Sequence, residues 1–174
     1  MRTIGLVGYA GVGKDTVGNI LCDNFNQSYS RFAFADELKS ELEDFIWDKF
    51  KINIFSCSRE EKEKVRDLLV FWGVKRRSQN PNYWLNKVMS KINDSDNYYN
   101  VVTDVRYANE ARAIQSCQLG EVWLLQRENI QPACQEEADS VSEVKEIADR
   151  ILNLPNVSNL EDLNPIILKE ICSF

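Results

Sequence analysis

Residues 1–16 read MRTIGLVGYAGVGKDT, and this stretch decides the fold. Thr3–Val7 is a short apolar run with β-branched residues, which predicts a strand buried on both faces of a parallel sheet. Gly8–Lys14 follows at once and fits the phosphate-binding pattern G-x-x-x-x-G-K. Glycines let the backbone approach a ligand, while free N–H groups and the next helix's N-terminus attract phosphate oxygens. Lys14 adds a mobile positive charge.

The residue after the lysine departs from this pattern. Asp15 stands where Ser or Thr is expected, and Thr16 follows one place later. In most such loops the hydroxyl after the lysine ligates Mg²⁺ directly. A carboxylate here could ligate through water or simply cap the helix, and both alternatives stay open. We assign to the phosphates of ATP and to Mg²⁺ the residues Gly11, Val12, Gly13, Lys14, Asp15 and Thr16.

The composition of the chain excludes several classes of protein and of catalytic site. The 174 residues suit one α/β domain, and the net charge of −6 argues against general nucleic-acid binding. No apolar run approaches the ~20 residues of a membrane span, and no signal-peptide pattern is present, so we expect a cytoplasmic protein without membrane partners. The five cysteines share no C-x-x-C spacing and are expected to be reduced. The absence of histidine leaves Lys, Arg, carboxylates and bound metal to perform any catalysis.

Strands and helices are expected to alternate along the chain. A Ser58-x-x-Glu61 capping box should open a helix that Gly73 ends, and Ser140-x-x-Glu143 should open another that reaches Leu152. The expected strands are 3–7, 30–35, 98–105 and 120–125, and the expected helices are 15–25, 36–50, 58–72, 80–92, 107–118, 140–152 and 160–171. The alternation predicts an α/β fold with a parallel sheet flanked by helices in three α/β/α layers, and the G-x-x-x-x-G-K loop makes it a P-loop NTPase fold. We expect one domain, 1–174.

Polar residues follow the ends of the expected strands. Asp36 comes after the second, Asp104 and Arg106 after the third, and Arg127 after the fourth. Ligands of open parallel sheets bind at the carboxyl ends of the strands, so these residues should face one crevice. Asp104 has the position of a carboxylate that holds a metal ion or its water shell, and a helix N-cap is the alternative for it.

Six segments, in order along nearly the whole chain, carry a resemblance to a known family. They are GYAGVGKDT at Gly8–Thr16, FADELK at Phe34–Lys39, VRDLLVFWG at Val65–Gly73, TDVRYANEA at Thr103–Ala111, SVSE at Ser140–Glu143 and NVSNLEDL at Asn156–Leu163. Together they resemble the phage-type deoxynucleoside monophosphate kinases, in which the GKDT variant is usual. Two departures are a missing histidine in the SVSE segment and a chain that is short for the family, which puts a lid or dimerisation segment in doubt.

The resemblance implies transfer of the γ-phosphate of ATP to a deoxynucleoside monophosphate, which gives dNDP for DNA precursor synthesis. It implies an acceptor-binding helical region at about 36–93, a short lid at about 127–140 and a homodimer, in the host cytoplasm if a phage encodes the chain. Catalysis is assigned to Lys14, Arg66, Asp104 and Arg106, with Asp15 and Asp104 at the metal. Arg127 and Asn159 are assigned to ATP, and Asp36, Lys39, Arg66, Trp72, Arg76, Arg77, Trp84 and Arg106 to the acceptor.

Purely structural alternatives remain for several of these residues. A single arginine is often a solvated surface charge, and a tryptophan at helical spacing more often packs in a core than stacks on a base. Other functions also remain open: a P-loop kinase for another acceptor, of the dephospho-CoA or phosphomevalonate type, or a nucleotide-binding module without catalysis. A GTPase is disfavoured because Asn86–Met89 lacks the aspartate of the N-K-x-D motif.

Overall fold

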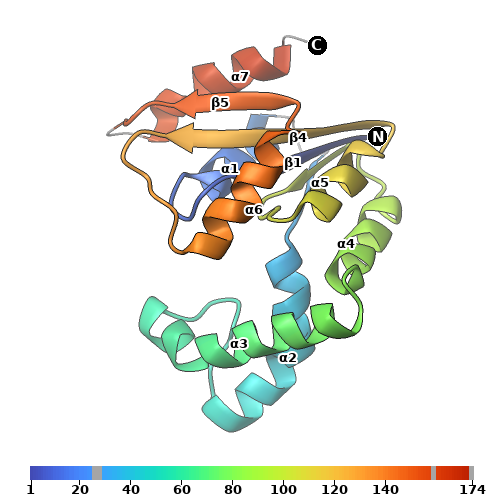
Figure 1. Cartoon of the computed structure of the whole chain (residues 1–174), viewed down its shortest axis with the longest axis vertical. Helices are drawn as coiled ribbons and strands as arrows, with labels where there is room; N and C mark the ends of the chain where they lie inside the picture. The colour runs from blue at the N-terminus through green and yellow to red at the C-terminus, as the bar shows by residue number, and fades with distance from the viewer. Residues whose placement is uncertain (25–28, 158–159, 173–174) are drawn as a thin grey trace. The chain divides into compact units, whose positions relative to one another are not determined.

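The computed structural model describes residues 1–24, 29–157 and 160–172 (Figure 1). In chain order the elements are β1 (Arg2–Val7), α1 (Lys14–Asn24), β2 (Tyr29–Phe32), α2 (Phe34–Phe50), α3 (Arg59–Gln79), α4 (Tyr83–Asn93), β3 (Tyr99–Val102), α5 (Ala108–Gln115), β4 (Leu119–Arg127), α6 (Gln135–Lys145), β5 (Arg150–Leu154), the 3₁₀ helix η1 (Leu160–Leu163) and α7 (Asn164–Cys172). No helix in this described part is both long and apolar enough to cross a membrane. The chain divides into two compact units, described here separately.

Unit 1 comprises Met1–Phe32 and Ile92–Phe174 and contains the whole sheet. The strands lie in the order β2-β3-β1-β4-β5, and every neighbouring pair is parallel. β1 is central: Gly5 is opposite Val102 of β3 on one side and Val122 of β4 on the other. Burial of a strand on both faces explains the apolar character of residues 3–7.

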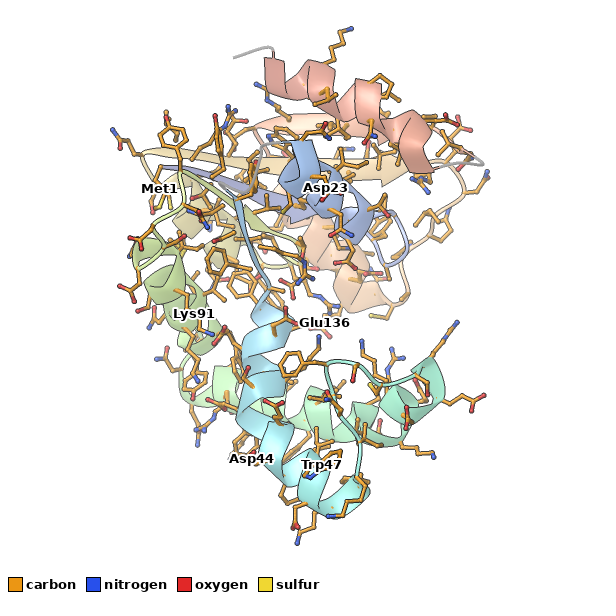
Figure 2. The ribbon with its side chains drawn as sticks, turned by 180° about the vertical axis from the view of Figure 1, so that it is seen from behind. Met1, Asp23, Asp44, Trp47, Lys91 and Glu136 are labelled. Atoms are coloured by element: carbon orange, nitrogen blue, oxygen red, sulfur yellow. The ribbon has the colours of Figure 1, made fainter. Side chains whose placement is uncertain are left out.

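Helices cover both faces of this sheet (Figures 1 and 2). On one face, Leu6 packs in a core with Leu21 of α1 and Ile167 of α7. On the other face, α5 packs against β1, since a Cβ on Gly5 would lie 2.7 Å from Cδ1 of Ile114, and α6 contacts α5. Three layers with a fully parallel sheet confirm the α/β fold predicted from the sequence.

Unit 2, Ala33–Lys91, is helical and has its own core. Residues of α2 and α3 pack together with the segment between them, among them Leu42, Ile46, Ile54 and Val65. The predicted capping box is present at the start of α3: the Glu61 N–H donates to Oγ of Ser58 at 3.2 Å, and the Ser58 N–H donates to Oε2 of Glu61 at 2.8 Å. This unit covers nearly the same residues as the predicted acceptor-binding region, whose role stays a prediction.

The prediction that Gly73 ends a helix is wrong, since α3 continues to Gln79 and residues 74–79 are helical. Gly73 is buried, and a Cβ at this position would lie 2.9 Å from Cδ1 of Leu38 on α2. The glycine therefore allows α2 and α3 to approach closely. It does not end α3.

A second prediction, a helix from Ser140 to Leu152, is also wrong. The helix α6 begins five positions before Ser140, whose hydroxyl donates to the Glu137 carbonyl at 3.1 Å in mid-helix. The chain then leaves the helix, because the N–H of Asp149 donates to the Val122 carbonyl at 2.9 Å and its carboxylate accepts from the Val122 N–H at 2.8 Å. These bonds attach it to β4 and begin the edge strand β5.

Candidate functional site

The glycine-rich loop joins β1 to α1 within unit 1. Gly8, Gly11 and Gly13 have φ values of +148°, +80° and +107°, which side chains with a Cβ rarely adopt. A Cβ on Gly8 would lie 2.5 Å from the Leu125 carbonyl oxygen of β4, so this residue also lets the loop pass close to the sheet. The conformation thus explains why glycine stands at these positions.

Gly8→Ala should therefore damage the loop more than Gly11→Ala. Both substitutions strain a positive φ, at a cost of about 1–3 kcal/mol, but only the Gly8 methyl group would also collide with backbone, since nothing lies within 4 Å of the Gly11 Cβ position. We expect Gly8→Ala to lose at least about tenfold more ATP affinity than Gly11→Ala, as measured by calorimetric titration. Equal affinities in the two variants would contradict this interpretation of the loop.

Lys14 begins α1 and folds back over the loop. Its ammonium group donates to the carbonyl oxygens of Gly8 at 2.6 Å and of Tyr9 at 3.0 Å. Burial lowers the pKa of Lys14, the positive charge of Arg106 lowers it further, and three carboxylates act in the opposite direction. Those carboxylates are Glu137, Asp15 and Asp104. The predicted residues Asp15, Asp104 and Arg106 therefore all act electrostatically on one ammonium group, as does a glutamate that was not predicted.

The turn after β3 presents Asp104 and Arg106. Asp104 is half-buried, whereas Arg106 is exposed. The buried carboxylate of Glu110 fixes this turn, because it accepts from the N–H groups of Arg106 at 2.9 Å and of Tyr107 at 3.2 Å. A rigid turn at the end of a central strand can hold charged side chains in a defined position beside the loop.

The carboxylates present fit a magnesium ion shared with a phosphate group. Asp15 has a side chain that is 80% exposed, and it accepts a hydrogen bond from Nη2 of Arg31 at 3.2 Å. Within the described ranges, no three Cys, Asp or Glu side chains are grouped so as to hold a metal ion by themselves. Mg²⁺ usually takes only one or two protein carboxylates and completes its shell with water and substrate phosphates. Asp15 and Asp104 supply that number.

A cavity of about 770 Å³ adjoins the glycine-rich loop in unit 1. Its lining includes Tyr9 and Val12 of the loop, Arg127 at the end of β4, Val141 of α6 and Pro155 after β5. Sites for small molecules and cofactors have volumes of roughly 300–1,000 Å³ and mix apolar walls with a few polar groups. The cavity therefore suits a nucleoside whose phosphates occupy the loop.

Arg127 lies where the cavity meets the loop. Its Nη2 would be 3.3 Å from a Cβ on Gly13, and its Nε and Nη2 are buried without a hydrogen-bond partner among the residues that the structure describes. A buried guanidinium with unpaired donors favours an anionic or polar ligand at this place. The prediction that Arg127 contacts ATP stays a prediction, as does the role of Asn159, which lies outside the described residues.

The predicted acceptor residues of unit 2 include two that meet at one carboxylate, Glu41 of α2. Its oxygens accept from Nε1 of Trp72 at 2.8 Å, Nε of Arg76 at 3.1 Å and Nζ of Lys87 at 2.8 Å, and from the hydroxyl of Tyr83. The Arg76 guanidinium lies 4.7 Å from the centre of the Trp72 ring. We call these five residues the Glu41 cluster. It joins α2, α3 and α4, and in this arrangement it engages both Trp72 and Arg76.

The Glu41 cluster should make unfolding depend on pH. Burial raises the pKa of Glu41, but the hydrogen bonds from Lys87, Tyr83, Trp72 and Arg76 outweigh it and lower the pKa from 4.5 to about 2. A carboxyl with a lowered pKa in the folded state stabilises the fold fully above its unfolded pKa, and this stabilisation is lost as pH falls from about 4.5 to about 2. We expect a loss of roughly 3 kcal/mol, measured by denaturant titration across this range.

The control for this pH prediction is Glu41→Gln, which has no carboxyl to titrate. Its unfolding free energy should fall less steeply between pH 4.5 and pH 2 than that of the unsubstituted chain. Identical slopes in the two proteins would show that Glu41 is not the group responsible.

Of the remaining acceptor candidates, Trp84 lies beside the cluster, with its ring centre 4.9 Å from that of Tyr83 in an edge-to-face contact. Lys39 forms an ion pair of 2.7 Å with Asp36 in the first turns of α2. Arg66 is exposed on α3 and lies 3.3 Å from Glu63, while Arg77 is half-buried in the last turn. Trp84 is 1% exposed, and its indole N–H donates to the Gly73 carbonyl at 3.2 Å. The indole of Trp84 is therefore packed in the core, which was the alternative to stacking on a base.

Sequence reasoning missed Glu137 and Glu41. Glu137 of α6 accepts from the Ala10 N–H of the loop at 2.9 Å. Each is one acidic residue in a helix rich in charge, and its partners lie far away in the chain, so no local pattern marks it. The only available signal for Glu137 was its place in the predicted lid.

Comparison with known proteins places the chain among kinases. The family model for phosphomevalonate kinase matches residues 6–120, more than half of the chain. No curated protein matches the sequence significantly.

Solved structures of low sequence identity share the fold. A shikimate kinase from Aquifex aeolicus vf5 has 14% identity and a TM-score of 0.54, with 99% of this chain and 97% of that chain covered. A dephospho-CoA kinase from Campylobacter jejuni has 16% identity and a TM-score of 0.55, with 99% and 96% covered. At these identities the likeness concerns the fold alone.

Proposed function

Because the chain belongs to the phosphomevalonate kinase family and has the fold of P-loop kinases, we propose that it transfers the γ-phosphate of ATP to the phosphate group of a small acceptor. The acceptor that we propose first is a deoxynucleoside monophosphate, with dNDP as product. The observation that carries the reaction type is the glycine-rich loop with Lys14 at its end, whose ammonium group interacts electrostatically with Asp15, Asp104 and Arg106.

The loop and its neighbours can perform the electrostatic part of phosphoryl transfer. This reaction depends on holding the two phosphates in line and on stabilising charge on the moving group. Loop N–H groups and the N-terminus of α1 would bind the donor's phosphates. Lys14 would exchange the Gly8 and Tyr9 carbonyls for phosphate oxygens, and Arg106 would add a second positive charge. The adjoining cavity, with Arg127, would take the nucleoside.

Asp15 and Asp104, with the hydroxyl of Thr16 nearby in sequence, are the residues that would hold Mg²⁺. When bound between phosphates, the ion neutralises their charge and helps to orient them.

An acceptor that is a phosphate monoester needs no general base. A phosphate monoester has its second pKa near 6 and is already largely ionised at neutral pH, so no general base has to activate it. The resemblance of Phe34–Lys39 and Val65–Gly73 to deoxynucleoside monophosphate kinases supports a nucleotide acceptor. For its phosphate we keep Arg66, Arg76 and Arg77, and Asp36 and Lys39 are further candidates for the acceptor.

Phosphomevalonate is the second candidate acceptor, and the family match supports it. It is also a phosphate monoester, so the same argument about ionisation applies. The two candidates differ in what surrounds the phosphate, a base and sugar in one and an acyclic carboxylic acid in the other.

A panel of acceptors with ATP and Mg²⁺ tests the proposal, with products identified by mass spectrometry. The panel holds the common deoxynucleoside monophosphates, phosphomevalonate and dephospho-CoA. We expect kcat/KM for at least one deoxynucleotide to exceed that for phosphomevalonate at least tenfold. Exclusive use of phosphomevalonate would select the second candidate, and ATP binding without any phosphorylated product would indicate a non-catalytic module.

A further inference from the structure

Glu137 connects the helix α6 to the phosphate-binding loop. Its Oε1 accepts the Ala10 N–H at 2.9 Å, and its Oε2 accepts the Ala133 N–H at 2.7 Å. One carboxylate therefore bridges the loop after β1 and the segment that precedes α6, both in unit 1. Figure 2 labels the neighbouring Glu136, in the same first turn of α6.

The Glu137 carboxylate accepts a hydrogen bond from an N–H group that could otherwise bind a phosphate oxygen. Ala10 is the third residue of the G-x-x-x-x-G-K segment, whose N–H groups are the donors that a phosphate chain would use. Glu137 also acts electrostatically on Lys14, the cation of the same loop. It thus interacts with two groups that the donor's phosphates require.

This carboxylate and a bound triphosphate repel each other. The contact lies at an exposed position, where solvent screens like charges, but at hydrogen-bonding range their repulsion still adds a cost in binding free energy. The Ala133–Glu137 hydrogen bond is local to the start of α6, so the carboxylate can leave Ala10 while this turn stays intact. The hydrogen bond between Glu137 and Ala10 can therefore break while the hydrogen bond to Ala133 remains.

We propose that Glu137 competes with the donor's phosphates for the loop: its carboxylate holds the start of α6 to the loop, and phosphate binding displaces it. The inference rests on the proposed function, because it takes the loop as the donor site. Glu137 thereby lowers donor affinity and couples loop occupancy to release of the start of α6. Glu137 is in this account a regulatory residue, and no step of phosphoryl transfer passes through it.

Binding of inorganic pyrophosphate and of ATP to three proteins tests this, by calorimetric titration at one salt concentration. They are the unsubstituted chain, Glu137→Gln and the matched control Glu136→Gln. The control removes the same charge from the neighbouring residue, whose carboxylate accepts a hydrogen bond from the Tyr107 hydroxyl at 3.0 Å. We expect Glu137→Gln to bind both ligands about tenfold more tightly than the unsubstituted chain, and Glu136→Gln to stay within about twofold. Equal affinities of the two variants, or weaker binding by Glu137→Gln, would overturn the proposal.

Hydrogen exchange on the unsubstituted chain gives a second test that does not depend on a variant's folding. Pyrophosphate should slow exchange in residues 8–14 and speed it in residues 133–140. Slower or unchanged exchange in residues 133–140 would mean that phosphate binding does not release Glu137 from Ala10. Failure of the proposed function looks different: ATP would bind no better than pyrophosphate and no acceptor would be phosphorylated, while the effect of Glu137→Gln on pyrophosphate would remain.

Discussion

Lys14→Ala should lower kcat/KM for phosphoryl transfer at least ~100-fold, which corresponds to about 3 kcal/mol of transition-state stabilisation. The ammonium group ends the glycine-rich loop and shares its surroundings with Arg106 and the carboxylates of Asp15 and Asp104. No histidine or second loop lysine is present that could take over its role. The effect should appear mainly in kcat, because a charge that follows the moving phosphate is most valuable in the transition state.

Steady-state kinetics with the best acceptor measure this effect, and thermal unfolding checks that the variant folds. Lys14 donates to two loop carbonyls, so a small loss of stability, about 1 kcal/mol, is expected. Lys169→Ala, an exposed lysine on α7, is the matched control and should retain full activity. Turnover like that of the unsubstituted chain in Lys14→Ala would end the assignment of the loop to the donor.

Glu41→Ala should destabilise unit 2 by about 3–5 kcal/mol, the largest stability effect that we expect from one substitution. Its side chain is only 13% exposed, and it accepts hydrogen bonds from two cations, an indole and a phenol. Removal of the carboxylate leaves Arg76 and Lys87 partly desolvated without a counter-charge, and the Trp72 N–H without its acceptor. Such losses cost more than the intact interactions contribute, because Arg76 and Lys87, with side chains 31% and 37% exposed, regain only part of their hydration.

Denaturant unfolding followed by tryptophan fluorescence reports mainly on unit 2, since three of the four tryptophans, Trp47, Trp72 and Trp84, lie there. The matched control is Glu43→Ala, which removes an exposed carboxylate from the same helix and should change stability by less than about 0.5 kcal/mol. Equal midpoints for the two variants would show that the cluster does not stabilise the helices that it joins.

The sequence predicted the parts of the fold whose residues are dictated locally. The loop required glycine at three positions with positive φ, and the buried central strand required an apolar run. The Ser58–Glu61 capping box likewise depends only on residues three apart. Each of these features was predictable because the physical cause and the residue pattern occupy the same few positions.

The errors arose where a partner distant in sequence decides the outcome. Gly73 stays within a helix because Leu38 of α2 packs against it, and β5 forms because Asp149 bonds to Val122 of β4. The same reason hid the unpredicted carboxylates. Glu137 meets Ala10 across 127 positions, and Glu41 meets Tyr83 across 42. Such contacts leave no periodic or spacing signal in the sequence.

The candidate site was predicted unevenly for the same reason. The residues around Lys14 follow strand ends of one parallel sheet, so the topology brings Asp104 and Arg106 toward it. Most acceptor residues come from helices and were assigned by resemblance, whereas Asp36 and Arg106 were also expected from their places after strands. Trp72 and Arg76 bond to Glu41 in this arrangement, and the assignment of these and the other acceptor residues stays a prediction.

The most direct test of the central claim follows the labelled γ-phosphate of ATP in a reaction with Mg²⁺ and a mixture of deoxynucleoside monophosphates. The account predicts that the label moves, in an acceptor-dependent way, to the terminal phosphate of a deoxynucleoside diphosphate, and that Lys14→Ala abolishes this movement. Label that stays in ATP, or that appears only as inorganic phosphate regardless of acceptor, would contradict it.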